Sequence, residues 1–329
     1  MKYRHALWRA AVAIWMASVL MPGPSAAQEL PYRLKWLFNS SAVGDIYADA
    51  RGFFTARGLH VTVKAGGPER DAIKELELGL ATFGVASADQ VIRAAAKGAP
   101  VLVIAQLFQV NPLQWIYRTD LPVINNAHEL RGRVIGITYG GNDETIMRSL
   151  LASAGLSDND VKLFSVRYDY TPFYQGRVDI WPVYRNSQGL ILEDHLKRAG
   201  ETVRFFDPSA HGVKFVANSV VTSERMAVEE PDTVRRFLDA LLSAWEASLD
   251  PARENDALVV LEKYDRETDR PMLTRQLAFT RSFVKPDPAV RIGTIDRAAW
   301  EQTENIMRQQ GLIDQPVNVV SRLRDPHSP

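Results

Sequence analysis

The sequence of 329 residues contains no cysteine. This absence excludes disulfides, thiol nucleophiles, cysteine-ligated zinc and iron–sulfur clusters, as well as a lipid anchor on an N-terminal cysteine. The chain also lacks a surplus of either charge, because 39 basic residues stand against 39 acidic ones. Binding to the phosphates of nucleic acids requires an excess of Lys and Arg, so nucleic acid is not expected as a partner.

Long hydrophobic runs are scarce as well. The apolar stretch at residues 10–21 is twelve residues long, whereas a membrane span requires roughly 20. It follows three basic residues and precedes small residues at Ser25 and Ala27, a pattern typical of a secretory signal peptide cleaved after Ala27. An uncleaved membrane anchor is the alternative, and its short length disfavours it. We therefore expect residues 1–27 to be removed, leaving a freely soluble protein in the periplasm.

The remaining chain alternates β-rich segments with amphipathic helical segments. Such alternation with short loops predicts mostly parallel sheets flanked by helices. Strands are expected at residues 32–37, 60–65, 83–86, 101–107, 113–117, 134–137, 161–166, 179–183, 203–206 and 215–222. Helices are expected at residues 45–57, 72–80, 87–96, 142–154, 188–199, 231–249, 254–264, 272–283 and 296–310. The late helices have no sheet of their own and must pack on an existing domain.

These patterns predict an α/β fold of two lobes. The first lobe is expected to be discontinuous, because the chain returns to it after the second lobe. Residues 28–118 and 217–315 are assigned to lobe 1, residues 119–216 to lobe 2, and residues 316–329 to a C-terminal tail. Two strands that cross between the lobes are expected to form a hinge.

Motifs for catalysis and metal binding are missing. The histidines have no metal-ligand spacing. The sequence also has no Gly-x-Ser-x-Gly nucleophile elbow, no phosphate-loop lysine motif and no G-x-G-x-x-G fingerprint. We therefore predict no catalytic residue, no metal site and no cofactor, and we do not expect an enzyme.

Aromatic and amide residues stand instead at predicted strand ends, where ligands collect in open α/β folds. Trp36 follows the first strand and is able to stack on a flat ligand, while Asn39 both donates and accepts hydrogen bonds. The alternatives, a core position for Trp36 and a turn at Asn39, are equally compatible with the sequence. Ser87 follows another strand, where it caps the next helix, contacts a ligand or does both.

Two further groups of candidate residues belong to the second lobe. Gly140, Gly141, Asn142 and Asp143 lie between a predicted strand and a helix, where the glycines allow close approach and backbone N–H groups are free. Capping of the helix is the favoured role of Asp143, and binding of a cationic group is the alternative. The second group clusters at the end of another strand and consists of Trp181, Tyr184, Asn186 and Gln188. This composition suits a planar polar solute better than a core.

Taken together and in order, these segments resemble periplasmic solute-binding proteins of the alkanesulfonate and thiamine-pyrimidine-precursor superfamily. The resemblance begins with Trp36, Asn39 and Gly44. It continues through Gly52-Phe53-Phe54, Gly58-Leu59, Gly79-x-Ala81-x-Phe83-Gly84-Val85, Ser87-Ala88-Asp89, Ala96-x-Gly98-x-Pro100-Val101, Leu130-Arg131-Gly132 and Gly176-Arg177-Val178-Asp179. It implies a two-lobed type II periplasmic binding protein that closes on a small solute and delivers it to the permease and ATPase of an ABC importer.

Within this superfamily, Trp36 with Asn39 and Tyr184 with Asn186 look closest to the thiamine-pyrimidine-precursor branch. Two positions depart from that branch, because Ala42 stands in place of a histidine and Gln188 in place of a glutamate. The resemblance implies a planar heteroaromatic solute bound by a monomer. A sulfonate or another organic anion is the alternative. An exported enzyme on the same scaffold is the third and least favoured reading. Related eukaryotic pyrimidine-forming proteins use cysteine and histidine chemistry, whereas this chain has no cysteine and carries Ala42 in place of the histidine.

Overall fold

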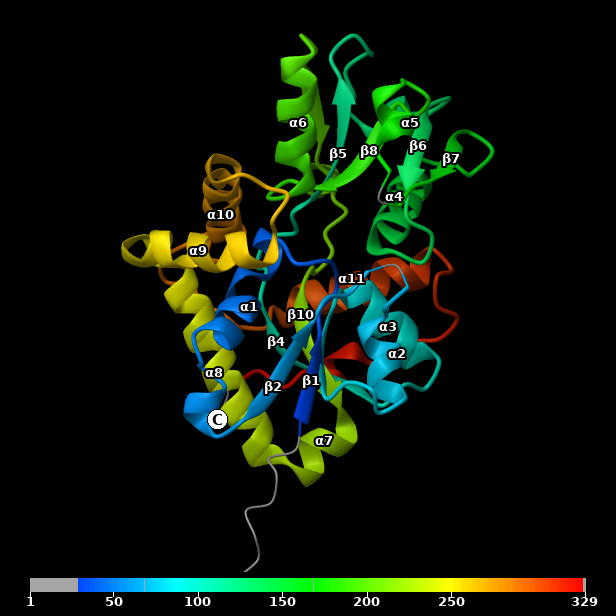
Figure 1. Ribbon diagram of the computed structural model, residues 1–329. Coiled ribbons are helices and arrows are strands. Elements are labelled where there is room, and N and C mark those ends of the chain that lie inside the picture. Colours follow the sequence, from blue (N-terminus) through cyan, green and yellow to red (C-terminus); the bar gives the residue numbers. More distant parts are fainter. Residues whose placement is uncertain (1–28, 68, 168, 328–329) are drawn as a thin grey trace, which may run out of the picture.

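The computed structural model describes residues 29–67, 69–167 and 169–327, so the predicted signal peptide lies outside the described residues. Two five-stranded sheets with helices on their faces form two lobes, one above the other in Figure 1. The predicted two-lobed α/β fold is therefore confirmed.

The sheet of the first lobe has the strand order β2-β1-β3-β10-β4. Its strands are β1 (Glu29–Arg33), β2 (His60–Lys64), β3 (Phe83–Ala86), β4 (Val101–Gln106) and β10 (Ser219–Ser223). β1 pairs in parallel with β2 and β3, whereas β10 runs antiparallel to β3 and β4. The sheet is thus mostly parallel, as predicted, with one reversed strand contributed by the returning chain.

The sheet of the second lobe has the order β7-β6-β8-β5-β9. Its strands are β5 (Leu113–Arg118), β6 (Val134–Ile137), β7 (Lys162–Ser165), β8 (Ile180–Tyr184) and β9 (Val203–Phe206). β6 pairs in parallel with β7 and β8, and β5 runs antiparallel to β8 and β9. Each lobe therefore contains one reversed strand next to a chain crossing.

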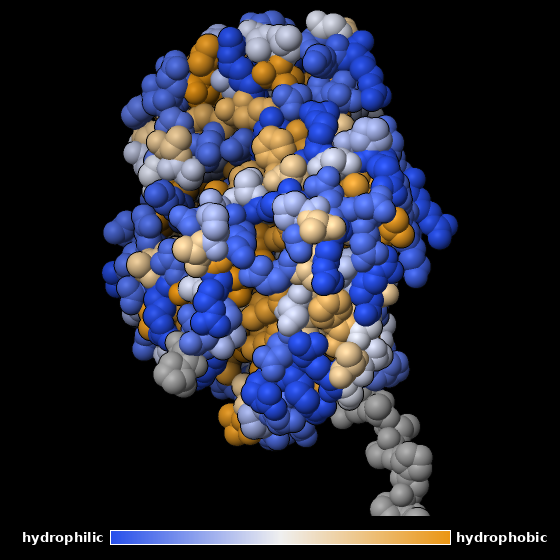
Figure 2. All heavy atoms as spheres, turned by 90° about the vertical axis from the view of Figure 1, so that its left-hand side faces the viewer, coloured by the Kyte–Doolittle hydropathy of each residue, from blue (hydrophilic) through white to orange (hydrophobic). Residues whose placement is uncertain are grey.

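Helices cover both sheets (Figure 1). The first lobe carries α1 (Val43–Ala50), α2 (Ala72–Glu77), α3 (Ala88–Ala96), α7 (Glu224–Glu229), α8 (Pro231–Leu249), α9 (Glu254–Tyr264), α10 (Arg270–Val284) and α11 (Arg297–Gln309). The second lobe carries α4 (Asn142–Ser153), α5 (Thr171–Tyr174) and α6 (Gln188–Arg198). Within the described ranges, no helix has the length and hydropathy of a membrane span. The face with α6 and α8–α10 is mostly hydrophilic, with hydrophobic residues in small patches (Figure 2).

The chain crosses between the lobes twice. β5 pairs with β8 and β9, so the first crossing lies at residues 107–112 and the predicted lobe boundary at residue 118 is wrong. The return crossing lies at residues 212–218, and neither crossing is itself a strand. The two crossings run side by side, because the backbone N–H groups of Leu107 and Phe108 donate to the carbonyl oxygen of Asn218, at 3.0 and 3.2 Å.

The core of the first lobe is built around α8. The ring of Phe237 stacks on Phe83 with 3.7 Å between centroids, and the edge-on ring of Tyr32 lies 5.2 Å away. α1 approaches α8 so closely that a Cβ at Gly44 would lie 2.1 Å from the indole of Trp245. Only glycine fits at this position, which explains the Gly44 of the sequence pattern.

The C-terminal segment packs on the first lobe. The carboxylate of Glu304 in α11 accepts hydrogen bonds from the backbone N–H groups of Val317 and Val319, at 2.7 Å each. Val319 and Leu323 are buried, and Leu323 forms a β-bridge with Val103. The predicted separate tail at residues 316–329 is therefore wrong as far as residue 327, because these apolar side chains complete the core beneath β4.

Candidate functional site

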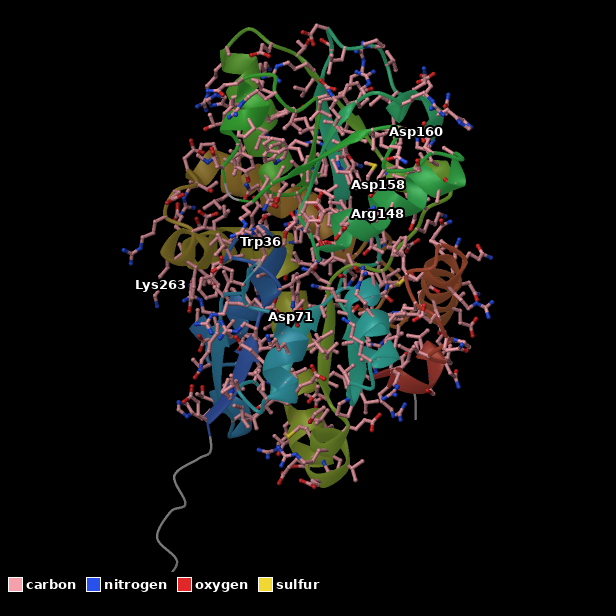
Figure 3. The ribbon with its side chains drawn as sticks, turned by 90° about the vertical axis from the view of Figure 1, so that its right-hand side faces the viewer. Trp36, Asp71, Arg148, Asp158, Asp160 and Lys263 are labelled. Atoms are coloured by element: carbon pink, nitrogen blue, oxygen red, sulfur yellow. The ribbon has the colours of Figure 1, made fainter. Side chains whose placement is uncertain are left out.

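A cavity of about 310 Å³ lies between the two lobes. The first lobe contributes the segment after β1 and the start of α2, and the second lobe contributes the start of α4 and the end of β8. Figure 3 labels Trp36 and Asp71, which lie where the lower lobe meets the upper one. The predicted site residues that line the cavity are Trp36, Asn39, Gly140, Gly141, Asn142, Asp143, Trp181, Tyr184 and Gln188. The strand-end argument thus brings together residues from both lobes.

Lys35 is the central polar residue of the cavity, and the sequence reasoning missed it. Its Nζ lies 3.0 Å from Asn142 Oδ1 and 2.7 Å from the hydroxyl of Tyr184, so it donates across the gap between the lobes. The hydroxyl of Tyr184 in turn donates to Asn218 Oδ1 at 3.4 Å. The sequence feature that could have identified Lys35 as a site residue is its position directly before Trp36, at the end of the same predicted strand.

The two tryptophans differ in their surroundings. Trp36 is half-buried in the loop after β1, and its carbonyl oxygen accepts a hydrogen bond from the N–H of Gly66 at 2.8 Å. Trp181 is only 1% exposed and packs against Tyr170 and Phe173, with ring centroids 5.8 and 5.9 Å apart. Trp36 therefore belongs to the cavity rim, whereas Trp181 lines the cavity from the hydrophobic core of the second lobe.

Asp143 organises the turn between β6 and α4. Its Oδ2 accepts a hydrogen bond from the N–H of Thr138 at 2.5 Å. Burial raises the pKa of its carboxyl to about 6, against the opposite effects of the Thr138 hydrogen bonds and the charge of Lys35. A Cβ at Gly141 would lie 2.5 Å from Asp143 Oδ1, so the turn requires glycine there. The carboxylate is therefore turned toward the backbone of the turn before α4. The predicted capping role is wrong, because Gly141 is the N-cap of α4 and no described side chain caps this helix.

Two predicted site residues lie outside the cavity. Ser87 is fully buried, its Oγ donates to Asp89 Oδ1 at 2.6 Å, and its N–H donates to Gln90 Oε1 at 3.1 Å. Ser87 therefore holds the start of α3, and the neighbouring Gln90 lines the cavity in its place.

Asn186 is the second residue outside the cavity. Its Nδ2 donates to Ser41 Oγ at 3.0 Å and to Thr280 Oγ1 at 2.8 Å. Ser41 follows β1 and Thr280 belongs to α10, so this fully buried side chain joins the second lobe to the first. The prediction failed because the side chains between β8 and α6 turn in different directions. Tyr184 at the end of β8 and Gln188 at the start of α6 line the cavity, whereas Asn186 in the loop between them points toward α10.

The mouth of the cavity carries charged residues of both signs. Arg70 and Asp71 line it from the first lobe and Arg167 from the second. Arg167 also forms an exposed ion pair with Glu69, at 3.2 Å between Nη1 and Oε1, across the mouth. Among the described residues, no three His, Asp or Glu side chains converge as metal ligands would. The arrangement combines an aromatic rim, an interior of hydrogen-bonding groups and a charged entrance, which is a geometry for binding a small molecule.

The chain is similar to a protein family and to several characterised proteins. A family model described as NMT1/THI5 like matches residues 39–254. The riboflavin-binding protein RibY of Chloroflexus aurantiacus is 25% identical over 92% of this chain and 88% of its own length. The formylaminopyrimidine-binding protein of Halalkalibacterium halodurans is 23% identical over 89% of this chain and 88% of its own.

Solved structures share the fold. The alkanesulfonate-binding protein SsuA from Xanthomonas axonopodis pv. citri, bound to MOPS, superposes with a TM-score of 0.69 at 16% identity. The superposition covers 91% of this chain and 99% of that protein. Several of the similar proteins are named as solute-binding proteins, and some carry the names of enzymes.

Proposed function

Because the chain belongs to the NMT1/THI5-like family, we propose that it is the periplasmic substrate-binding component of an ABC importer. It captures a small planar heteroaromatic solute, a thiamine pyrimidine precursor or a related heterocycle, and presents it to a membrane permease driven by an ATPase. Relatives named for binding riboflavin and formylaminopyrimidine support a ring of this kind. The protein acts as a monomer and as a receptor rather than an enzyme.

The observation that carries this proposal is the position of Trp36 beside the polar cluster of Lys35, Asn142 and Tyr184. A half-buried indole offers a face on which a flat ring stacks, and the polar cluster then bonds to the edge of that ring. A cavity of about 310 Å³ is at the small end of the range for ligand sites, roughly 300–1,000 Å³. A one- or two-ring solute matches this size.

Capture requires the lobes to separate and close. The bonds from Lys35 to Asn142 and Tyr184 join the lobes inside the cavity, and the two crossings permit rotation of the lobes as rigid bodies. We therefore expect the radius of gyration from small-angle scattering to fall when the solute is added. Equal radii at confirmed saturation would contradict closure.

Export is tested separately from binding. Removal of residues 1–27 is expected, so intact-mass measurement of the periplasmic protein should give a chain that starts at Gln28. Recovery of the complete chain in the membrane fraction would overturn this part of the proposal.

The ligand class is tested by mass spectrometry of the small molecules that the purified protein releases on denaturation. A heteroaromatic compound with near-stoichiometric yield supports the proposal. An aliphatic sulfonate or carboxylate would favour the second candidate function, capture of an organic anion. The positive charges of Lys35, Arg70 and Arg167, which line the cavity, support this second candidate. Conversion of the released compound when it is returned to the protein would instead establish an enzyme.

A further inference from the structure

Five side-chain amides line the cavity, and all of them are oriented in the same way. They come from both lobes and are Asn39, Gln90, Asn142, Gln188 and Asn218. In every one of them, the amide oxygen accepts a hydrogen bond from the protein. Among the described residues, none of the five amide nitrogens donates to a protein acceptor, and the buried Nδ2 of Asn142, a residue 7% exposed, has no partner at all.

The orientation of four of these amides follows from the chemistry of their partners. Asn39 Oδ1 accepts from the backbone N–H of Ser41 at 2.8 Å, and Gln90 Oε1 accepts from the backbone N–H of Ser87 at 3.1 Å. A backbone N–H only donates, so a rotated amide would place two donors against each other. The same reasoning applies to Asn142, which faces the ammonium of Lys35 at 3.0 Å.

Gln188 is held in the same way from two sides. Its Oε1 accepts from the backbone N–H of Tyr184 at 3.3 Å and from Ser187 Oγ at 2.7 Å. The fifth amide, that of Asn218, is oriented by a relay, because Lys35 donates to the hydroxyl of Tyr184, which is left to donate its own hydrogen to Asn218 Oδ1. Lys35 thus orients two amides. It bonds directly to Asn142, at the start of α4, and acts through Tyr184 on Asn218, in the return crossing.

The two acidic residues that line the cavity each have one carboxylate oxygen bonded to a backbone N–H, and two carboxylates do not match five amide NH2 groups and the ammonium of Lys35. The carboxylate of Asp143 accepts from the N–H of Thr138, and Asp71 Oδ1 accepts from the N–H of Lys74 at the start of α2. The polar interior therefore offers an excess of N–H donors to whatever enters. A buried donor without a partner is costly, so such a site favours a ligand that supplies acceptors and rejects one that brings further donors.

We infer that the cavity selects planar heterocycles whose edges carry carbonyl oxygens, such as ring diones, over their amino-substituted analogues. This inference rests on the proposed capture of a heteroaromatic solute and specifies its chemistry. We assign Gln188 as a specificity-determining residue, because its oxygen is held from two sides and its side chain lines the cavity. A glutamate in its place keeps one oxygen on Tyr184 N–H and exchanges the donor for an acceptor.

A matched pair of probes tests the inference. Lumazine (pteridine-2,4-dione) and 2,4-diaminopteridine share one bicyclic ring. Lumazine presents two carbonyl oxygens and two ring N–H groups, whereas the diamino compound presents two amino groups, with four N–H bonds, and two unprotonated ring nitrogens at the same positions. Calorimetric titration of the full mature chain should show lumazine binding at least about tenfold more tightly. Equal or tighter binding of the diamino compound would overturn the inference while leaving the proposed function in place. Binding of neither compound at millimolar concentration would overturn both.

Variants sharpen the same test. Gln188→Glu should weaken lumazine at least about tenfold and strengthen the diamino compound, so that the preference reverses. Gln175→Glu is the matched control, because Gln175 is exposed at the end of α5 and does not line the cavity. It should leave both affinities unchanged. Thermal melts of both variants verify the fold, and an unchanged preference in a folded Gln188→Glu protein would refute the assignment of Gln188.

Discussion

The two walls of the cavity hold their tryptophans in different ways. The wall of the first lobe is a loop, and Trp36 stands on it half-buried, between the end of β1 and the short helical turn at Ser40–Ala42. The wall of the second lobe is strand β8, and Trp181 stands on it inside a hydrophobic cluster with Phe173, Val183 and Leu192. The same residue type is therefore proposed to serve recognition in the first lobe, where it is half-buried beside the cavity, and it packs in the hydrophobic core of the second lobe.

The difference lies in what surrounds each indole rather than in the residue. A strand alternates its side chains between the two faces of a sheet, so Trp181 is fixed by the pleat and covered by α5 on its own lobe. Trp36 has already left the strand, and the loop that carries it is held by Gly66 of the neighbouring loop. Substitutions that separate stability from binding test this contrast.

Truncation of Trp181 should have the largest effect. Trp181→Ala removes a buried aromatic side chain, which costs roughly 3–5 kcal/mol of the free energy of unfolding. Chemical denaturation measures this loss, and Trp181→Phe, which keeps a ring against Phe173, should recover most of it. A stable Trp181→Ala protein with weakened ligand binding would show instead that both walls recognise the ligand.

Asp45 carries a buried carboxyl that should make the free energy of unfolding depend on pH. It lies in the core of the first lobe, where it accepts hydrogen bonds from Tyr32 at 2.7 Å and Trp245 at 3.3 Å. Burial raises the pKa of its carboxyl to about 7, from an ordinary value of 3.8, against the opposing effect of these two bonds. The native state therefore holds this proton more tightly than the unfolded chain does.

The free energy of unfolding should fall as the pH rises from about 4 to about 7, because the contribution of this carboxyl is complete below the unfolded pKa and is lost toward the folded one. Each pKa unit is equivalent to about 1.4 kcal/mol. Urea denaturation at a series of pH values should show a flatter dependence in Asp45→Asn than in the wild type. An identical slope in both proteins would remove Asp45 as the cause.

Asn186 joins the second lobe to the first, and its truncation should have an intermediate effect on the free energy of unfolding. Asn186→Ala deletes the hydrogen bonds to Ser41 and Thr280 and leaves buried hydroxyls with one partner fewer, a loss of about 1–3 kcal/mol. Denaturation and scattering together measure stability and lobe separation. Asn125→Ala, at an exposed position of the second lobe, is the control and should change neither.

Truncation of Trp36 should have the smallest effect on folding and a selective effect on binding. Trp36→Ala should weaken binding of the released solute at least about tenfold, equivalent to 1.4 kcal/mol. The melting temperature should stay close to that of the wild type, and Trp36→Phe should bind with intermediate affinity. A sharply lowered melting temperature with unchanged affinity would move Trp36 from the rim to the core.

Much of the fold was predictable because it depends on local patterns. The β-rich segments, the helical spacing and turn glycines such as Gly58, whose φ is 68°, express constraints that residues close in sequence impose. The membership of β5 in the second sheet was not predictable in this way, because it depends on pairing with β8 and β9, which lie some sixty residues or more further along the chain. The packing of Val319 and Leu323 depends on similarly distant contacts.

The site was predictable at the level of segments and less so at the level of side chains. The segments around Trp36, Asn142 and Tyr184, which were selected as strand ends, line one cavity between the lobes. Sequence alone did not indicate that Asn186 turns toward Thr280 while Gln188 turns toward the cavity. It also gave no orientation for the amides, since that depends on which backbone N–H or ammonium stands opposite each oxygen.

Asn218 lies where the two chain crossings meet and also lines the cavity. In a rigid-body rotation, atoms near the axis move least. In the closure proposed above, the amide of Asn218 would therefore move little, while the start of α4 would move with the second lobe. A solute that enters the open protein would then meet Asn218 together with the first-lobe residues Trp36 and Gln90, and closure would add the contacts with the second lobe.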